Sequence, residues 1–132
     1  MKKLIIFILC LLSISAYAEE DPCLDFLLNN AEINLNKEQK SEISNIKKLL
    51  YSEISSKQQN LSTEENKLKS LLRNDDATDA EITTTKKKIE ELQSFISSKK
   101  VKYWQDAKKI LNATQSEKLR ELRFKQNISC KN

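Results

Sequence analysis

The chain of 132 residues contains no glycine and a single proline. Tight turns, β-bulges and phosphate-cradling loops depend on the backbone freedom of glycine or on the fixed φ of proline. Sheets and nucleotide-binding loops are therefore disfavoured, and long helices remain. A hydrophobic content of 39%, with 6% aromatic and 32% charged residues, suits coiled-coil-like helices better than a thick globular core. We expect an all-α fold.

The first eighteen residues have the pattern of a secretory signal peptide. Lys2 and Lys3 give a positive start, residues 4–12 form an apolar run, and an A-x-A cleavage site ends at Ala18. The apolar run is far shorter than the ~20 residues that cross a bilayer as a helix. We expect a periplasmic protein, with cleavage after Ala18, no stable membrane insertion afterwards and a single domain over residues 19–132.

Charge and residue types restrict the function classes. Removing Lys2 and Lys3 from the 23 basic residues leaves 21 against 19 acidic ones, a near balance that gives little support for nucleic-acid binding. The chain has no histidine, the commonest catalytic base and a frequent metal ligand. We therefore expect no catalytic site, no metal and no cofactor.

Two cysteines remain after the leader, Cys23 and Cys130, one near each end of the mature chain. In an oxidising compartment the simplest pairing is one intrachain disulfide. Closing a loop of about a hundred residues contributes up to about 4–5 kcal/mol through chain entropy. An intermolecular bond and two free thiols are the alternatives.

Local start and stop signals divide the mature chain into helices. Asp21-Pro22 is an N-cap followed by proline at the first helical position, and this short helix should end near Asn29-Asn30. Residues 74–77 break the chain, and Thr78 and Glu81 then form a capping box. Three longer helices are expected. The first covers about 37–73, the second runs from the capping box to about 110, and the third covers about 113–126. The two long ones should form an antiparallel hairpin.

Apolar periodicity supports this hairpin. The first long helix has a narrow stripe and the second repeats apolar residues at seven-residue intervals, as expected for two helices packed along their length. The stripes consist of Ile43, Leu50, Ile54, Leu61, Leu68 and Leu72, and of Ile82, Ile89, Ile96, Tyr103 and Ile110. Phe95 and Val101 lie off the second stripe, and Trp104 lies at its edge.

Two short motifs of the form L-N-x-x-Q recur where helices should begin. They contain Leu35, Asn36 and Gln39, and Leu111, Asn112 and Gln115. Asparagine at the N-cap accepts a bond from a first-turn amide, and glutamine three positions later reaches back to the cap amide. Lysine or serine occupies the position on which the preceding leucine would usually pack, so each leucine is free to pack against another helix.

Two such motifs, one opening each of the second and fourth helices of an exported helical chain, resemble the Spy/CpxP family of periplasmic LTxxQ-motif proteins. Asparagine stands here where that family usually has threonine, a change that preserves capping. The resemblance implies a thin, curved, intertwined homodimer of helical hairpins that binds unfolded or partly folded envelope proteins without ATP during envelope stress. A small two-helix hairpin also gains stability from a second copy.

Lysine clusters and off-stripe apolar residues suggest where clients bind. The lysines are ordinarily the solvated backs of helices; together with apolar neighbours they would form an amphipathic surface that holds many clients weakly. The candidate client surface consists of Ile46, Leu49, Leu71, Lys86, Lys87, Phe95, Lys99, Val101 and Lys102. The alternative function is a signalling accessory protein that binds the sensor domain of an envelope-stress kinase. A single saturable partner without general anti-aggregation activity would favour that alternative.

Overall fold

The computed structural model describes residues 21–130. The expected signal peptide and its cleavage after Ala18 lie outside this range. The described chain is helical, with α2 (Pro22–Asn29), the short 3₁₀ helix η2 (Ala31–Ile33), α3 (Lys37–Arg73), α4 (Asp79–Ile110) and α5 (Ala113–Gln126). The expected all-α fold, and the expected ranges of the helices, are confirmed. Within residues 21–130 no helix combines the length and the apolar character that a membrane span requires.

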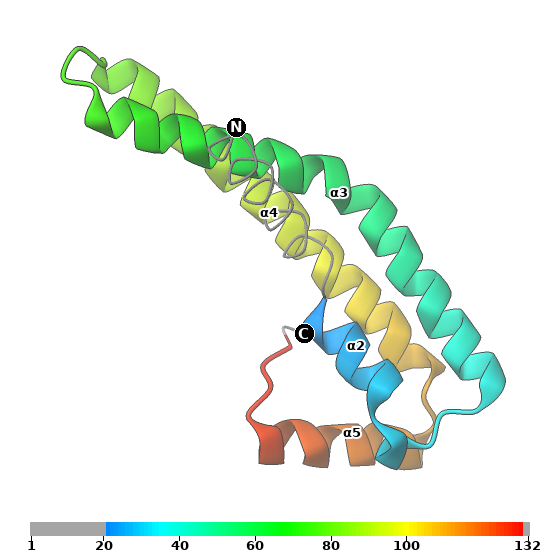
Figure 1. Ribbon diagram of the computed structural model, residues 1–132. Helices are drawn as coiled ribbons and strands as arrows, with labels where there is room; N and C mark the ends of the chain where they lie inside the picture. Colours follow the sequence, from blue (N-terminus) through cyan, green and yellow to red (C-terminus); the bar gives the residue numbers. More distant parts are fainter. Residues whose placement is uncertain (1–20, 131–132) are drawn as a thin grey trace, which may run out of the picture.

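Helices α3 and α4 form a long antiparallel hairpin, joined at its tip by residues 74–78 (Figure 1). The Asn74 amide donates to the carbonyl of Leu71, which closes α3. The Thr78 hydroxyl accepts from the Glu81 amide at 3.2 Å, and the Glu81 carboxylate accepts from the Thr78 amide at 3.0 Å. Both helix ends at the tip are thus satisfied by local groups, without any third element.

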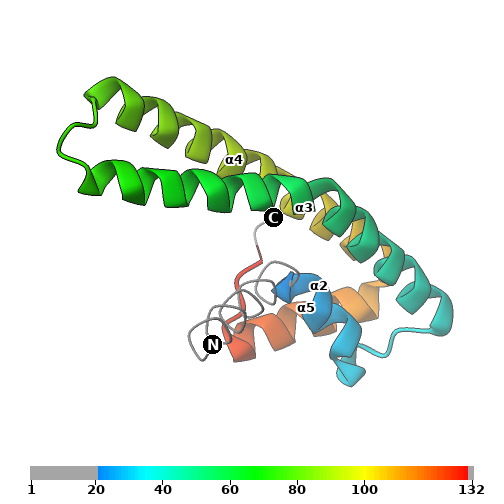
Figure 2. The same cartoon turned by 45° about the horizontal axis from the view of Figure 1, so that its top comes forward.

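The apolar stripes meet along the hairpin, but their burial decreases toward the tip. Ile43, Leu50 and Ile54 of α3 are buried, whereas Leu72 near the end of the same stripe is 62% exposed. Figures 1 and 2 show the reason: the tip projects away from α2 and α5, so the two helices cover only each other there. The hairpin is therefore an arm with a well-packed base and a thin tip.

The base of the hairpin is covered by α2, η2 and α5. Leu24 and Leu27 of α2 are fully buried, and Leu119 and Leu122 of α5 join the same apolar cluster. Trp104, at the edge of its stripe, is only 2% exposed because it belongs to this cluster at the base. The molecule is thus bent, with α5 lying across the lower end of the arm (Figure 2).

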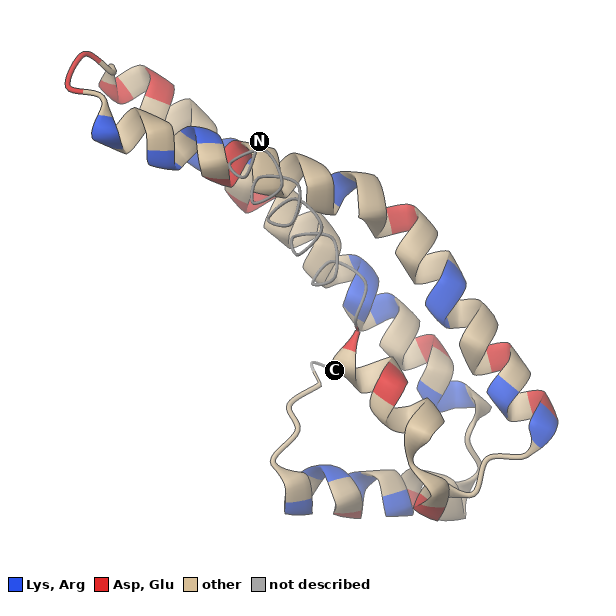
Figure 3. Cartoon of the chain, in the orientation of Figure 1, with Lys and Arg blue, Asp and Glu red and all other residues tan. Residues whose placement is uncertain are grey.

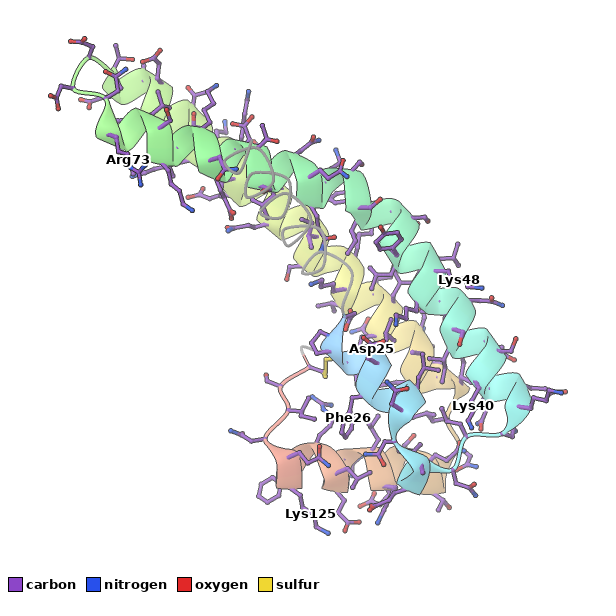
Figure 4. All side chains as sticks on the ribbon, viewed as in Figure 1. Asp25, Phe26, Lys40, Lys48, Arg73 and Lys125 are labelled. Carbon is purple, nitrogen blue, oxygen red and sulfur yellow. A yellow bond between two sulfur atoms is a disulfide. The ribbon has the colours of Figure 1, made fainter. Side chains whose placement is uncertain are left out.

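A disulfide between Cys23 and Cys130 joins the start of α2 to the segment that follows α5, with a Cα–Cα distance of 6.0 Å. Figure 4 shows this bond in yellow, and Phe26 in the space between α2 and α5. The expected intrachain pairing is confirmed. Arg123 of α5 also holds this segment, because its guanidinium donates to the Cys130 carbonyl at 2.8 Å.

Candidate functional site

Both L-N-x-x-Q motifs form complete capping boxes, as expected. Asn36 Oδ1 accepts from the Gln39 amide at 2.8 Å, and Gln39 Oε1 accepts from the Asn36 amide at 2.9 Å. Asn112 and Gln115 repeat the arrangement at the start of α5, with distances of 2.8 and 3.0 Å. Each motif therefore begins its helix by purely local hydrogen bonds.

The two motif glutamines also bind each other, which the sequence alone did not predict. Gln39 Nε2 donates to Gln115 Oε1 at 2.7 Å, and Gln115 Nε2 donates to Gln39 Oε1 at 2.9 Å. The second proton of each amide reaches a carbonyl of the opposite connection, Ile110 at 3.1 Å and Asn34 at 3.0 Å. Each of these carbonyls lies two residues before a motif asparagine, so the two halves are related by a local twofold arrangement.

We call this Gln39–Gln115 pair the amide clasp. Both of its side chains use all their donors and acceptors, which suits the partly buried position and, for Gln115, an exposure of only 7%. Leu35, which precedes the first motif, is buried in the core, and Leu111, which precedes the second, is half-buried against it. The paired motifs therefore lock the open end of the hairpin and have a structural role.

One face of the hairpin has a charged seam, which we define as Glu53 and Lys57 of α3 with Phe95, Lys99 and Tyr103 of α4. The Tyr103 hydroxyl donates to Glu53 Oε1 at 2.6 Å, and Lys99 Nζ lies 3.2 Å from Glu53 Oε2. The ammonium groups of Lys57 and Lys99 lie over the Phe95 ring, at 5.3 and 5.5 Å from its centroid. Two cations, one from each helix, thus contact the Phe95 ring.

These contacts perturb two ionisable groups. The hydrogen bond from Tyr103, followed by the contact with Lys99, lowers the pKa of the Glu53 carboxyl below its ordinary value of 4.5. The same hydrogen bond to Glu53 raises the pKa of the Tyr103 hydroxyl above its ordinary value of 10.0. The charged seam therefore favours an ionised carboxylate beside a protonated phenol.

The candidate client residues do not form one surface. Ile46 and Leu49 precede Glu53 by seven and four residues, and Leu71 follows Lys57 by fourteen, so at 3.6 residues per turn these three share the face of the charged seam. Lys102 extends that face, with its ammonium 5.1 Å from the centre of the Tyr103 ring. Lys86 and Lys87 are exposed on α4 nearer the tip.

Val101 lies on the other side of α4, in what we call the inner groove. This groove has a volume of about 330 Å³ and lies between α4, the start of α2 and the segment after α5. Its lining consists of Leu61 of α3, six residues of α4 and the two disulfide-linked segments: Asp21, Pro22, Cys23, Leu61, Gln93, Ile96, Ser97, Lys100, Val101, Trp104, Ser129 and Cys130.

Helix periodicity explains why the inner groove and the charged seam are separate. Trp104 follows Phe95 by nine residues, which is two and a half turns, so the two aromatic side chains leave α4 on opposite sides. Leu61, Ile96 and Trp104 of this lining lie on the predicted apolar stripes or at their edge. The spacing of Gln93, Ser97, Lys100 and Trp104, by four, three and four residues, is the signal that marks a second face.

The inner groove has mostly apolar walls, with Asp21 and Lys100 as the charged residues of its lining. In the part of the chain that the structure describes, no three acidic or cysteine side chains gather in a way that could hold a metal ion. Both signs of charge are distributed along the two long helices, and acidic residues gather at the tip (Figure 3). Comparison of the chain with protein-family models, curated proteins and solved structures found no match.

Proposed function

We propose that this chain is an exported, ATP-independent chaperone of the holdase type, similar to the Spy/CpxP family, that binds unfolded or partly folded proteins in the periplasm. The observation that carries the proposal is the inner groove, whose apolar side chains line an open surface at the bend of the molecule. Unfolded chains expose apolar side chains that such a groove can cover. The signal-peptide pattern and the disulfide both support an oxidising compartment outside the cytoplasm.

Weak binding follows from the dimensions of the groove. Burial of apolar surface contributes about 25 cal/mol per Å², and a groove of about 330 Å³ accepts only a few side chains. A client would therefore be retained briefly and released without ATP. Exposed lysines such as Lys86 and Lys87 would increase the rate at which acidic client segments arrive.

Aggregation of a denatured model protein, followed by light scattering, tests this function. The mature chain should suppress aggregation at a several-fold molar excess. Val101→Asp places a charge in the inner groove and should abolish most of the suppression, because a carboxylate opposes apolar clients. Thr83→Asp introduces the same charge at an exposed position of α4 outside the groove lining and should retain the activity.

Two outcomes would contradict the proposal. Failure of the unsubstituted chain to suppress aggregation would exclude a general holdase. Equal suppression by the unsubstituted chain and by both variants would show that clients bind somewhere other than the inner groove.

We also propose that the chain forms a homodimer of hairpins. Large apolar side chains remain exposed on several elements, among them Leu49 at 53%, Leu72 at 62% and Phe124 at 89%. A second copy that covered part of this surface would stabilise so thin a molecule. A bent dimer would also place two inner grooves in one assembly.

A further inference from the structure

The inner groove contains one lysine among its apolar walls. Lys100 lines the groove beside Ile96 and Val101, one turn of α4 before Trp104. Its ammonium forms no ion pair, hydrogen bond or ring contact with any residue in the range 21–130. The neighbouring lysines differ, because Lys99 pairs with Glu53 and Lys102 lies over Tyr103. Within the described range, Lys100 is therefore free to contact an anionic partner that enters the groove.

The acidic side chain of the groove is already engaged. Asp21 is 8% exposed, and its Oδ1 accepts from the amides of Cys23 at 2.9 Å and Leu24 at 3.4 Å. This carboxylate caps α2 and compensates the positive end of that helix. Among residues 21–130, the groove thus has one cation that pairs with no other residue, and one oxygen of its carboxylate accepts the capping bonds.

The groove lining contains polar side chains besides Lys100, and they are spread along the length of the groove. Gln93, Ser97 and Lys100 follow one another on the same face of α4, and Ser129 lies on the opposite segment. A peptide backbone carries acceptors and donors at every residue, so it can use such a row. A fatty acid has polar atoms at one end only and would leave the others unpaired.

We propose that the inner groove binds the carboxyl-terminal end of an unfolded polypeptide. The last apolar side chains pack on Leu61, Ile96 and Val101, and the terminal α-carboxylate pairs with Lys100. This assignment rests on the proposed chaperone function and specifies the part of the client that is recognised. The volume of about 330 Å³ suits a chain end of two or three residues.

Fluorescence anisotropy of a short labelled apolar peptide, prepared with either a free carboxylate or a carboxamide at its end, tests the assignment. The free acid should bind about tenfold more tightly than the amide, because a charge-assisted hydrogen bond is lost in the amide. Binding should also change the emission of Trp104, the single tryptophan of the chain, which lines the groove. This second signal locates the peptide.

Two variants of the protein complete the experiment. Lys100→Gln should remove the preference for the free acid while leaving affinity for the amide unchanged. Lys69→Gln changes an exposed lysine of α3 that lies outside the groove lining and should retain the full preference. Because the acid and the amide are compared on the unsubstituted protein as well, the result does not depend on the folding of either variant.

Four outcomes would overturn the assignment. Equal affinity for acid and amide would exclude carboxylate recognition while leaving the chaperone proposal intact. An acid preference that survives in Lys100→Gln would place the carboxylate elsewhere. Suppression of aggregation without any binding of the peptide would show that clients bind outside the inner groove. Binding of decanoate as tight as that of the peptide acid would identify a site for anionic amphiphiles instead.

Discussion

The side chains of Gln39 and Gln115 each form a local capping bond and long-range hydrogen bonds. Each Oε1 accepts one hydrogen bond from the backbone amide of its own helix cap and another from the side-chain amide of the other glutamine. A local cap and a contact between residues 76 positions apart therefore share the same oxygen atoms. Loss of either glutamine weakens the start of one helix and leaves the partner amide without its acceptor.

Alanine variants test this coupling. Gln39→Ala and Gln115→Ala should each lower the free energy of unfolding by about 1–3 kcal/mol, because each removes a capping bond and opens the amide clasp. The double variant should lose less than the two single losses combined, since either change alone already breaks the clasp. Urea unfolding measures all three. Gln59→Ala, in the exposed middle of α3, serves as control, and strict additivity would contradict the coupling.

The Glu53–Tyr103 contact predicts a dependence of stability on pH. The pKa of Glu53 is lowered in the folded state. Its contribution to the free energy of unfolding is therefore fully present at a pH above its ordinary pKa of 4.5, and it is lost as pH falls through the folded-state pKa. The pKa of Tyr103 is raised in the folded state. Its contribution to the free energy of unfolding is therefore fully present at a pH below its ordinary pKa of 10.0, and it is lost as pH rises through the folded-state pKa. Stability should decrease at both extremes.

Thermal unfolding followed by circular dichroism between about pH 3 and pH 11 measures this dependence. Glu53→Gln should reduce the loss of stability on the acidic side of the profile, because the amide does not titrate, while Glu121, whose pKa is also lowered by Lys125, keeps its own contribution. Glu65→Gln, at an exposed position of the same helix, should leave the profile unchanged. A flat profile for the unsubstituted protein would exclude the contribution of this pair.

At the scale of the helices, capping signals predicted the elements well. Thr78 with Glu81, Asn36 with Gln39 and Asn112 with Gln115 each form the local bonds that their spacing indicated. Such bonds involve residues only three positions apart, so neighbouring residues suffice to determine them. The first residues of α3, α4 and α5 follow directly from these signals.

Contacts between distant elements could not be predicted in the same way. Gln39 and Gln115 meet only because α5 folds back onto the start of α3, and Trp104 is buried only because the elements at the base enclose it. The candidate client residues were grouped by type, and the structure separates Val101 from Phe95 because the two lie on different faces of α4. Periodicity defines the faces of each helix, but docking decides which faces are covered.

Helix α2 depends on the disulfide more than the long helices do. It has eight residues, too few for an isolated helix in water, and it is held by buried leucines and by Cys23. The Cys23→Ser, Cys130→Ser double variant should lose about 2–5 kcal/mol of stability in urea unfolding. Reduction of the unsubstituted protein should reproduce this loss, and a double variant as stable as the oxidised protein would contradict it.

The whole molecule is a thin arm on a well-packed base, a shape that predicts association. Light scattering coupled to size exclusion should give the mass of two mature chains. The midpoint of thermal unfolding should also rise with protein concentration, because a dimer is stabilised by mass action. A monomer mass and a midpoint independent of concentration would together contradict the proposed homodimer.

The disulfide has a topological consequence for the whole molecule. With Cys23 joined to Cys130, 107 positions apart, nearly all of the described chain is a closed covalent ring. A protease that cuts once within the ring, for example at the exposed residues 74–76 of the tip, opens the ring but releases no fragment. The nicked protein would remain one molecule until a thiol reduces it, so a single cut at the tip leaves the base, its inner groove and their covalent connection in place.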